Sequence, residues 1–349
     1  MNMNKKTVVI GMSGGVDSSV AAYLLKQQGY HVIGVTMQTC ETTENHAEID
    51  AKRIASTLEI PYYTIDFKQE FQKNVIDYFI VEYQQGRTPN PCIVCNRYVK
   101  WEALLKFKQQ VGADFIATGH YAQITKHPET QRYTLKTSAT GAKDQTYALY
   151  NLTQEQLQNT LMPIGVYHKE EIRKIAEKID ISIAQKADSQ EICFIPDNDY
   201  SNFIEQKTGK YPCGNFVDLD GNILAKHNGI IHYTVGQRKG LGVSFGKPMY
   251  VYGINVEKNE VILCENDALF QKTLYANRLN FVGIEKIEQE MRFQAKIRYN
   301  HKKAWCTARI KDNQLECVFD EPQRAITPGQ ALVLYDGDYV ACGGTIISY

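Results

Sequence analysis

The chain has 349 residues, of which 43% are hydrophobic and 22% are charged, and its 39 basic and 39 acidic side chains give a formal net charge of zero. This length predicts two or three domains, and the composition excludes a disordered chain. A neutral chain has no overall attraction for nucleic acid, so any RNA binding needs a local basic patch. No apolar run approaches the ~20 residues that span a bilayer, so we expect a cytoplasmic protein without a membrane partner.

The first half of the sequence alternates short apolar segments with helical patterns. Strands are predicted at residues 7–11, 31–37, 62–65 and 115–118. Helices are predicted at residues 18–28, 47–58, 71–83 and 98–111. Such alternation indicates an α/β fold in which helices wrap a parallel sheet.

The pattern changes near residue 200. From Gly229 onward, the glycine-punctuated segments IIHYTV, PMYVYGIN and EVILCEN are typical of hairpin strands. The final segments RFQAKIRY, AWCTARIK, QLECVFDE and QALVLYDG alternate at period two, which predicts a small antiparallel β-barrel. We therefore expect an α/β domain over residues 1–200, a small, mostly β central domain over 201–272, and a C-terminal β-barrel over 273–349.

The strongest local signal is GMSGGVDSS, residues 11–19, directly after the first predicted strand and before the first predicted helix. Glycines let backbone amides approach an anion, and the helix N-terminus adds partial positive charge. Ser13, Ser18 and Ser19 are further hydrogen-bond donors, and Asp17 is well placed to hold Mg²⁺. The segment is neither a Walker loop nor a dinucleotide fingerprint. The alternative is an ordinary glycine-rich turn with a capping Asp or Ser.

Nine cysteines are scattered along the chain, at positions 40, 92, 95, 193, 213, 264, 306, 317 and 342. This pattern favours reduced thiols, some of them reactive, over a disulfide framework. Cys92 and Cys95 follow the stiff segment GRTPNP and precede a predicted helix, whose N-terminus favours thiolates. Zinc, iron–sulfur and redox roles are alternatives for this pair, but no second pair at zinc-finger spacing accompanies it. Cys193 lies far along the chain, in DSQEICFIP.

Several motifs together resemble a known family. SGGVDSS resembles the pyrophosphate-binding loop of N-type ATP pyrophosphatases (PP-loop enzymes), which cleave ATP between the α and β phosphates and adenylate a substrate oxygen. With GRTPNPCIVCN, ATGHYA, KDQTYAL, DSQEICFIP, HYTVGQRKGLG and ITPGQALVLYDGD in this order, nearly the whole chain resembles the tRNA-specific 2-thiouridylases. The resemblance implies a transferase, a tRNA-uridine 2-sulfurtransferase. Such an enzyme adenylates O2 of the wobble uridine (position 34), releases pyrophosphate and AMP, and leaves 2-thiouridine.

The family implies separate roles for the cysteines. Cys193 carries the persulfide, and Cys95 is the nucleophile that assists sulfur release and forms a transient disulfide with Cys193. Many members have an acid–base Asp at the position of Cys92. A thiol of pKa ~8.5 can lose its proton near neutrality but is not equivalent to a carboxylate. The alternative is that the three cysteines bind a [4Fe–4S] cluster.

The resemblance also implies binding sites for ATP and tRNA. The expected ATP contacts are Gly11, Met12, Ser13, Gly14, Gly15, Val16, Asp17, Ser18, Met37 and Gly119. The expected tRNA contacts are Asn90, Pro91, Cys92, His120, Lys143, Asp144, Gln145, Tyr299, Asn300 and Gln330. Ordinary alternatives are a core methionine at 37, a turn glycine at 119 and a satisfied loop histidine at 120.

A basic segment with an aromatic residue lies in the predicted barrel, namely Lys296, Arg298, Tyr299, Asn300, His301, Lys302 and Lys303. It supplies the local positive charge that RNA binding requires, although a solvated charged surface is the alternative. By the resemblance, the barrel binds tRNA and residues 1–200 are the PP-loop catalytic domain. The expected partners are the tRNAs for Lys, Glu and Gln and a sulfur-donor protein of the cysteine desulfurase relay.

Two other classes of function compete. A synthetase for a small molecule, like the asparagine, argininosuccinate or GMP synthetases, has the ATP loop but does not need Cys95, Cys193 or a basic barrel. A non-enzymatic RNA-binding or metal-sensing module leaves SGGVDSS unexplained. Measuring AMP formation from ATP with and without tRNA distinguishes the three.

Overall fold

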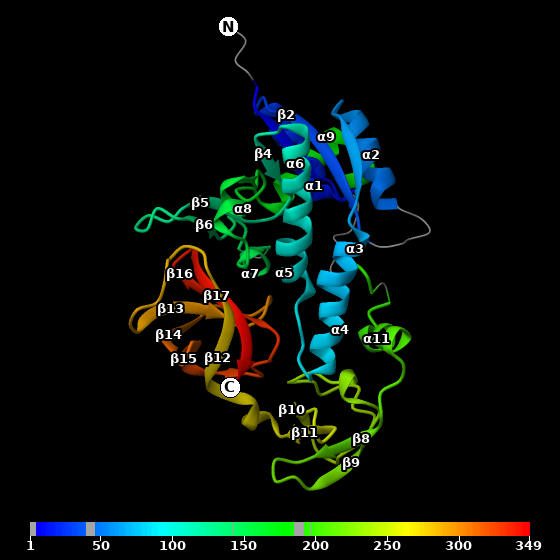
Figure 1. The fold of residues 1–349 in the computed structure, drawn as a ribbon, viewed down its shortest axis with the longest axis vertical. Coiled ribbons are helices and arrows are strands. Elements are labelled where there is room, and N and C mark those ends of the chain that lie inside the picture. The colour runs from blue at the N-terminus through cyan, green and yellow to red at the C-terminus, as the bar shows by residue number, and fades with distance from the viewer. Residues whose placement is uncertain (1–4, 40–45, 142, 185–191, 196) are drawn as a thin grey trace.

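The computed structural model describes residues 5–39, 46–141, 143–184, 192–195 and 197–349. Within these ranges the chain forms a parallel sheet, a smaller central sheet and a barrel (Figure 1). Cys40 and the residues 188–191 of DSQEICFIP lie outside the described residues. The α/β fold class with a β-rich centre and a C-terminal antiparallel barrel is confirmed.

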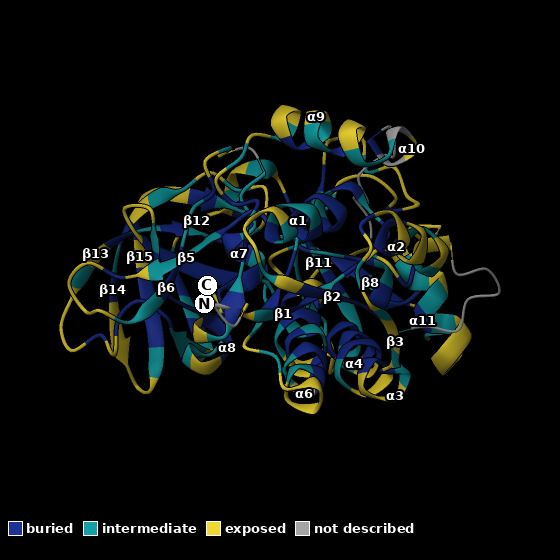
Figure 2. Cartoon of the chain, turned by 90° about the horizontal axis from the view of Figure 1, so that it is seen from above, coloured by how far each residue is buried: buried dark blue, intermediate teal, exposed yellow. Residues whose placement is uncertain are grey.

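The first sheet is parallel and has the strand order β3-β2-β1-β4-β7. Its strands are β1 (Thr7–Gly11), β2 (His31–Gln38), β3 (Tyr62–Asp66), β4 (Phe115–Ala117) and β7 (Thr160–Leu161). Val8, Val9 and Ile10 are fully buried because helices cover both faces of the sheet (Figure 2).

Successive residues of β1 face opposite layers of helices, as the period of a strand requires. Val8 and Ile10 pack against α1 and α9, whereas Val9 packs against α6. The helices of the two layers and their connections are α1 (Val16–Gln27), α2 (His46–Thr57), α6 (Trp101–Val111), α7 (Thr146–Leu149), α8 (Gln154–Gln158), α9 (Lys169–Ile179) and α10 (Ile181–Ala184).

Two long helical stretches each contain a π-helical turn. The first runs through α3 (Lys68–Phe71), the π-helical residues Gln72–Ile76 and α4 (Asp77–Gln84). The second runs through α5 (Pro91–Cys95), the π-helical residues Asn96–Lys100 and α6. The sequence predicted the second to begin only at residue 98. It begins earlier because Asn90 caps it and proline fits the first helical position.

The central domain contains a four-stranded sheet of order β10-β11-β8-β9, preceded by α11 (Tyr200–Thr208). Its strands are β8 (Gly214–Val217), β9 (Ile223–His227), β10 (Tyr250–Asn255) and β11 (Glu260–Cys264). The prediction of a strand in IIHYTV (residues 230–235) was wrong, because none of these residues is in a strand. Ile230–His232 forms a 3₁₀ turn that buries two adjacent isoleucines on one side, which an extended strand cannot do.

The barrel closes through the pairing of its first and last strands. After a 3₁₀ turn at Asn266–Leu269, its strands are β12 (Phe270–Phe281), β13 (Met291–Lys296), β14 (Ala304–Lys311), β15 (Gln314–Arg324), β16 (Ala331–Asp336) and β17 (Tyr339–Ser348). A hairpin of β5 (Gln123–Lys126) and β6 (Tyr133–Lys136), which the sequence analysis missed, extends the barrel sheet through β17.

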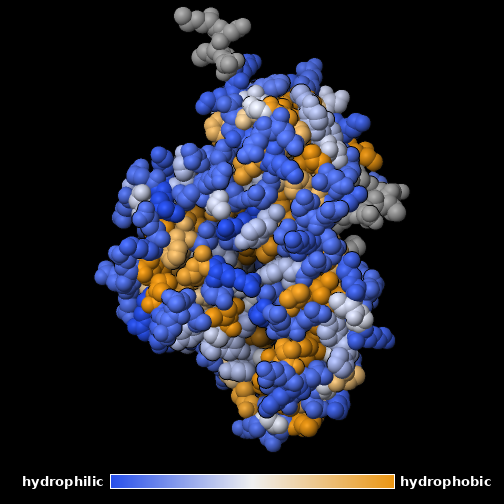
Figure 3. Space-filling model, in the orientation of Figure 1, coloured by the Kyte–Doolittle hydropathy of each residue, from blue (hydrophilic) through white to orange (hydrophobic). Residues whose placement is uncertain are grey.

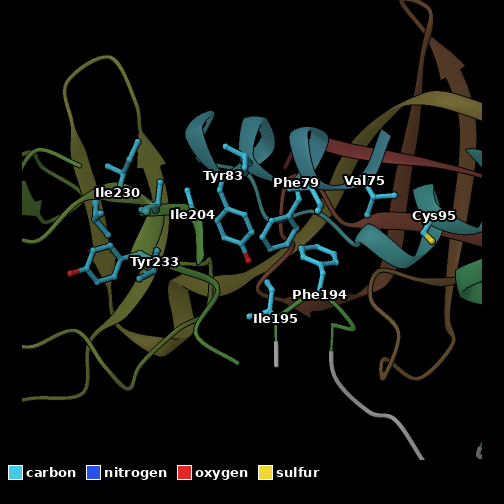
Figure 4. Close-up of a cluster of buried hydrophobic side chains, with 14 of the residues drawn as sticks. Val75, Phe79, Tyr83, Cys95, Phe194, Ile195, Ile204, Ile230 and Tyr233 are labelled. Carbon is cyan, nitrogen blue, oxygen red and sulfur yellow. The ribbon is translucent and has the colours of Figure 1, made fainter. Parts of the chain in front are cut away.

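One apolar core joins the first domain to the central domain. Phe79 and Tyr83 of α4 lie in it beside Phe194, and Ile230 and Tyr233 of the central domain continue it (Figure 4). This core therefore fixes Phe194, the neighbour of Cys193, by apolar packing.

The outer surface seen in Figure 3 is mostly hydrophilic, with smaller hydrophobic patches on the barrel and the central domain. No helix in the described part of the chain is long and apolar enough to cross a membrane.

Candidate active site

The phosphate loop turns between β1 and α1 as its glycines require. Gly14 has φ +67°, and a Cβ on it would collide with the backbone of Ala47. The Ser13 N–H donates to Ser18 Oγ at 3.2 Å, and the Ser18 and Ser19 hydroxyls donate to the Gly15 carbonyl at 3.3 and 2.8 Å. Serine side chains therefore hold the loop open around the N-terminus of α1, where Gly15 is the N-cap and Val16 the first helical residue.

The loop lies against the carboxyl ends of the neighbouring strands, where ligands of such sheets bind. The Met12 N–H donates to Val35 O at 2.8 Å, and Thr36 Oγ1 donates to Met12 O at 2.7 Å. Met37 is half-buried beside Gly11. A Cβ on Gly119 would lie 2.7 Å from the carbonyl carbon of Asp17, so only glycine allows this approach. The expected ATP residues are thus brought together.

Two residues that the sequence analysis missed hold Asp17. Its Oδ1 accepts a hydrogen bond from the Tyr121 hydroxyl at 2.7 Å and lies 2.7 Å from Lys169 Nζ. Tyr121 is buried and belongs to ATGHYA, which was a usable signal. Lys169 begins α9, 152 residues after Asp17, and no sequence pattern connects the two.

The cysteine loop places two thiols one helical turn apart. Cys92 is exposed, and its N–H donates to Asn90 Oδ1 at 3.1 Å. Pro91 is buried, and Cys95 is 6% exposed at the end of α5 (Figure 4). Cys193 is exposed and lies next to the buried Phe194.

Phe194 fixes the position of Cys193 from the core side. Its ring packs edge-on against Phe71 and Phe79, with centroids 5.6 and 5.5 Å apart.

Lys100 connects the three thiols electrostatically. Burial lowers the pKa of Lys100, but Coulomb attraction to Cys95, Cys92 and Cys193 outweighs burial and raises the pKa above its ordinary value. Cys95 directly precedes the π-helical turn, and Lys100 is the last residue of that turn. π-Helical turns inside α-helices are common at functional sites. The structure thus brings together cysteines that are about 100 residues apart in sequence, around a lysine that the sequence analysis missed.

These cysteines do not form a metal site in the described residues, which contain no group of three or more His, Cys, Asp or Glu able to hold a metal ion. The iron–sulfur alternative is therefore not confirmed, and no step is derived through a cluster.

His120 follows Gly119, which packs on Asp17 of the phosphate loop, and is within electrostatic range of Lys100. Its Nδ1 is 2.9 Å from Thr118 Oγ1, and its ring centroid is 5.5 Å from that of Trp101. Burial, with a smaller effect of Lys100, lowers the pKa of His120 to about 3. The imidazole is therefore neutral at physiological pH and can contact RNA only as a hydrogen-bonding group or a ring.

Thr88 of the first domain, four residues before Cys92, is hydrogen bonded to both of the other domains. Its N–H donates to Pro328 O at 2.9 Å, and its carbonyl accepts from Gln330 Nε2 at 2.8 Å, both in the barrel. Its hydroxyl lies 3.0 Å from that of Thr234 in the central domain. Gln330, an expected tRNA contact, is therefore bound to the cysteine loop in this structure.

A buried ion pair anchors the start of the same loop. The guanidinium of Arg87 makes two hydrogen bonds, of 2.6 and 2.8 Å, to the carboxylate of Glu82, which is 2% exposed. Such two-point pairing fixes direction as well as distance. The loop therefore enters α5 along a defined path.

The expected tRNA residues 143–145 are partly structural. The Asp144 carboxylate accepts from the Ser138 N–H at 3.1 Å and from the Thr146 hydroxyl at 2.5 Å. Gln145 exchanges two hydrogen bonds, of 2.8 and 2.9 Å, with the backbone of Tyr121. Lys143 is half-buried, and its N–H donates to Thr140 Oγ1 at 3.3 Å.

The basic segment of the barrel, residues 296–303, contains a lysine that lies close to two tyrosine rings. The Lys296 ammonium lies 5.9 Å from the ring centroid of Tyr147 and 5.8 Å from that of Tyr299. Burial lowers the pKa values of Lys296, Arg298 and Lys303, as expected for cations taken partly out of water.

Tyr299 connects this segment to the cysteines. Burial, Asp144 and Cys92 together raise the pKa of Tyr299, so its ring lies within electrostatic range of Cys92. After β13, Tyr299 is 38% exposed and therefore partly covered, whereas Asn300 and Lys302 are exposed. Tyr299 of the basic segment is thus within electrostatic range of Cys92, which sequence spacing could not show.

Family models match three consecutive parts of the chain. Residues 6–197 match the model described as tRNA methyl transferase HUP domain, residues 201–265 match tRNA methyl transferase PRC-barrel domain, and residues 271–346 match aminomethyltransferase beta-barrel domain.

Full-length relatives have the name tRNA-specific 2-thiouridylase MnmA. The one from Lachnoclostridium phytofermentans is 59% identical, over 98% of this chain and 99% of that protein. The one from Clostridioides difficile is 53% identical over 99% of both chains, and the one from Acetivibrio thermocellus is 54% identical over 99% and 100%. The family descriptions and these names differ in the group transferred.

Proposed function

The chain belongs to the tRNA-specific 2-thiouridylase family, and we propose that it replaces the 2-oxygen of the wobble uridine of tRNA with sulfur, using ATP. One observation carries the proposal: the Lys100 ammonium is within electrostatic range of Cys92, Cys95 and Cys193 and of His120, whose neighbour Gly119 packs on Asp17 of the phosphate loop. Activation and sulfur delivery thus share one site.

The first step activates the base. A uridine C2=O has a poor leaving group, and attack of O2 on the α phosphorus of ATP converts it to an AMP ester while pyrophosphate leaves. The amides of Gly14, Gly15 and the first turn of α1 would hold the phosphates. Asp17 is the candidate ligand for Mg²⁺, which would offset the charge on the departing pyrophosphate.

The second step transfers sulfur. The terminal sulfur of a Cys193 persulfide attacks C2, and AMP leaves with the former O2. The Cys95 thiolate then attacks Cys193 Sγ, which breaks the S–S bond, leaves sulfur on C2 and forms a Cys95–Cys193 disulfide. A thiol reductant must reopen this disulfide before the next turnover. The ammonium of Lys100 is within electrostatic range of both cysteines that take part in this step.

Cys92 occupies the position where many family members have an acid–base Asp. It is exposed at the first turn of α5. We assign it the proton exchange with the uridine, within a pocket that Asn90 and Pro91 border.

The barrel supplies the surface for tRNA in this proposal. Lys296, Arg298 and Lys303 are cations already partly desolvated, beside Tyr299 and close to Cys92. Extracting the wobble base from its stack costs about a few kcal/mol, which stacking on an aromatic ring can offset.

The remaining assignments follow the family. Residues 1–200 act as the catalytic domain, 201–272 as the connecting domain, and 273–349 as the tRNA-binding domain. The substrates are the tRNAs for Lys, Glu and Gln, and a protein of the cysteine desulfurase relay supplies the persulfide.

The test uses the full chain with ATP, Mg²⁺, unmodified tRNA and a persulfide donor, with AMP and modified nucleosides measured together. We expect AMP to form only with tRNA and a uridine in which sulfur has replaced oxygen. A methylated uridine would instead support the transfer named in the family descriptions. AMP formation that depends on a small molecule would support a synthetase.

A further inference from the structure

The two tryptophans of the chain have opposite surroundings. Trp101 is fully buried, and its indole N–H donates to Thr160 Oγ1 at 2.9 Å. Trp305, on β14 of the barrel, is 52% exposed. Tryptophan is the largest apolar side chain and is enriched where proteins contact other molecules. The neighbours of Trp305 in the barrel indicate which molecule can cover it.

The guanidinium of Arg292 holds the indole of Trp305 in place. It lies over the ring, 5.5 Å from the centroid. It is itself fixed by two hydrogen bonds, of 2.6 and 2.7 Å, to the Asp320 carboxylate and by one of 3.2 Å to Thr307 Oγ1. Two-point pairing of this kind sets direction as well as distance. The ring is therefore oriented before any ligand binds, which lowers the entropic cost of stacking on it.

The strand register places Trp305 on the same face as two lysines of the basic segment. β13 and β14 pair Gln294 with Trp305. Side chains alternate between the two faces of a strand, so Lys296 and Lys303, each two residues away along its strand, share this outer face. Two residues correspond to about 7 Å along a strand. Trp305 thus lies next to the two lysines on the outside of the barrel.

The same face leads across the sheet to the junction with the first domain. Gln294 also pairs with Tyr335 of β16, whose hydroxyl lies 3.1 Å from Thr146 Oγ1 of the first domain. Because neighbouring strands are about 4.8 Å apart, Trp305 lies about 10 Å from the strand that contacts the first domain. It therefore continues the basic segment, residues 296–303, outward from this junction.

The charge of this surface fits a polyanion. β13 and β14 contain basic but no acidic residues. Arg292 is paired with Asp320, and the cations at the far end of β14 are paired with glutamates. In the described part of the chain Lys296 and Lys303 make no ion pair, although Asp144 is within electrostatic range of both. Cations beside a stacking ring are the combination with which proteins bind unpaired nucleotides.

We propose that Trp305 stacks on an unpaired base of the tRNA outside the wobble position, with Lys296 and Lys303 attracting the phosphates beside it. This inference rests on the proposed function and extends its tRNA surface from the basic segment onto β14. The distance of about 7 Å between the lysines and Trp305 corresponds to about two nucleotides at the spacing of a stacked strand. Every base has a π-face, so this contact adds affinity without selecting a base.

The two tryptophans allow a direct test on the full chain. Acrylamide, a soluble quencher of fluorescence, reaches the exposed Trp305 but not the buried Trp101. We expect unmodified tRNA for Lys to protect Trp305 from acrylamide. The protection should disappear in Trp305→Phe, in which Trp101 is the one remaining tryptophan.

Binding measurements on the same tRNA give the size of the contact. Trp305→Ala should weaken binding by about fivefold to a hundredfold, the loss typical of one base stacked on an aromatic ring. The slope of affinity against salt concentration should stay unchanged, because no charge is removed. Trp305→Tyr should retain most of the affinity. The control Ile310→Ala removes another exposed apolar side chain from β14 and should bind like the wild type.

Three results would overturn the assignment. Acrylamide quenching of Trp305 that tRNA leaves unchanged is one, and wild-type affinity in Trp305→Ala is another. Protection that rises with protein concentration in the absence of tRNA would show a contact between two copies of the chain instead. The proposed function fails separately: a wild type that protects Trp305 with tRNA but forms no 2-thiouridine refutes the function alone. A wild type that forms 2-thiouridine while Trp305 stays accessible refutes the stacking alone.

Discussion

Replacing Gly329 by alanine tests whether the barrel positions the cysteine loop. Gly329 has φ +92° in the turn that holds Thr88. A Cβ there would lie 2.9 Å from Thr88 N and 3.0 Å from its carbonyl carbon and oxygen. The new methyl group therefore pushes on backbone atoms four residues before Cys92, and backbone cannot rotate away as a side chain can.

The expected magnitude has two parts. Alanine in left-handed backbone costs about 1–2 kcal/mol, and overpacking a tight contact costs about 1–3 kcal/mol more. Relief to ordinary contact distance needs a shift of about 0.5 Å. Since a 1 Å misplacement can cost about a hundredfold in rate, we expect a loss of about tenfold in thiolation at saturating tRNA and ATP.

Gly337→Ala is the matched control. Gly337 has φ +57° in an exposed turn of the same barrel, and a Cβ on it would meet no heavy atom within 4 Å. Gly337→Ala should lose only the stability that alanine in left-handed backbone costs, about 1–2 kcal/mol, and should lose no activity. Thermal unfolding of both variants measures the loss of stability, and single-turnover thiolation measures the loss of activity. Equal thiolation rates in Gly329→Ala and Gly337→Ala would refute the positioning role.

Three further outcomes are expected. Cys193→Ser should still release AMP with tRNA but form no 2-thiouridine, because a hydroxyl cannot carry a persulfide; thiolation near the wild-type rate would remove Cys193 as the carrier. Cys92→Asp should retain substantial activity and Cys92→Ala should be slower, whereas stoichiometric iron in anaerobically purified wild type, lost with activity in Cys92→Ala, would support the cluster mechanism. Lys302→Ala, which removes an exposed cation, should lower the salt dependence of tRNA binding by about one unit of slope, and an unchanged slope would make Lys302 a solvated residue.

Gln330 makes a different contact in the structure from the tRNA contact that the family resemblance implies. The family resemblance implies a tRNA contact, but the structure shows its Nε2 bonded to Thr88 O at 2.8 Å. A change of Gln330→Ala in which kcat falls at constant KM for tRNA would support the contact with the loop, and a rise in KM alone would support the contact with RNA.

Local patterns in the sequence were enough to predict much of this protein. The strand β1 and the turn into α1 follow from a buried apolar run and a glycine-rich loop, both of which depend on neighbours in the chain. The barrel strands follow from period-two alternation, as β14 (Ala304–Lys311) shows by matching its predicted segment. Ordered motifs then indicated the family and its cysteines.

Tertiary structure alone decided which side chains share the site. Lys169 reaches Asp17 across 152 residues, and Lys100 attracts Cys193, which lies 93 residues later in the chain. The contact of Thr88 with Gln330 spans 242 residues. Such pairs arise where helices pack on a sheet and a barrel docks on a loop. Periodicity reports only which side of an element is apolar, so it determines the elements but not the partners that packing brings to them.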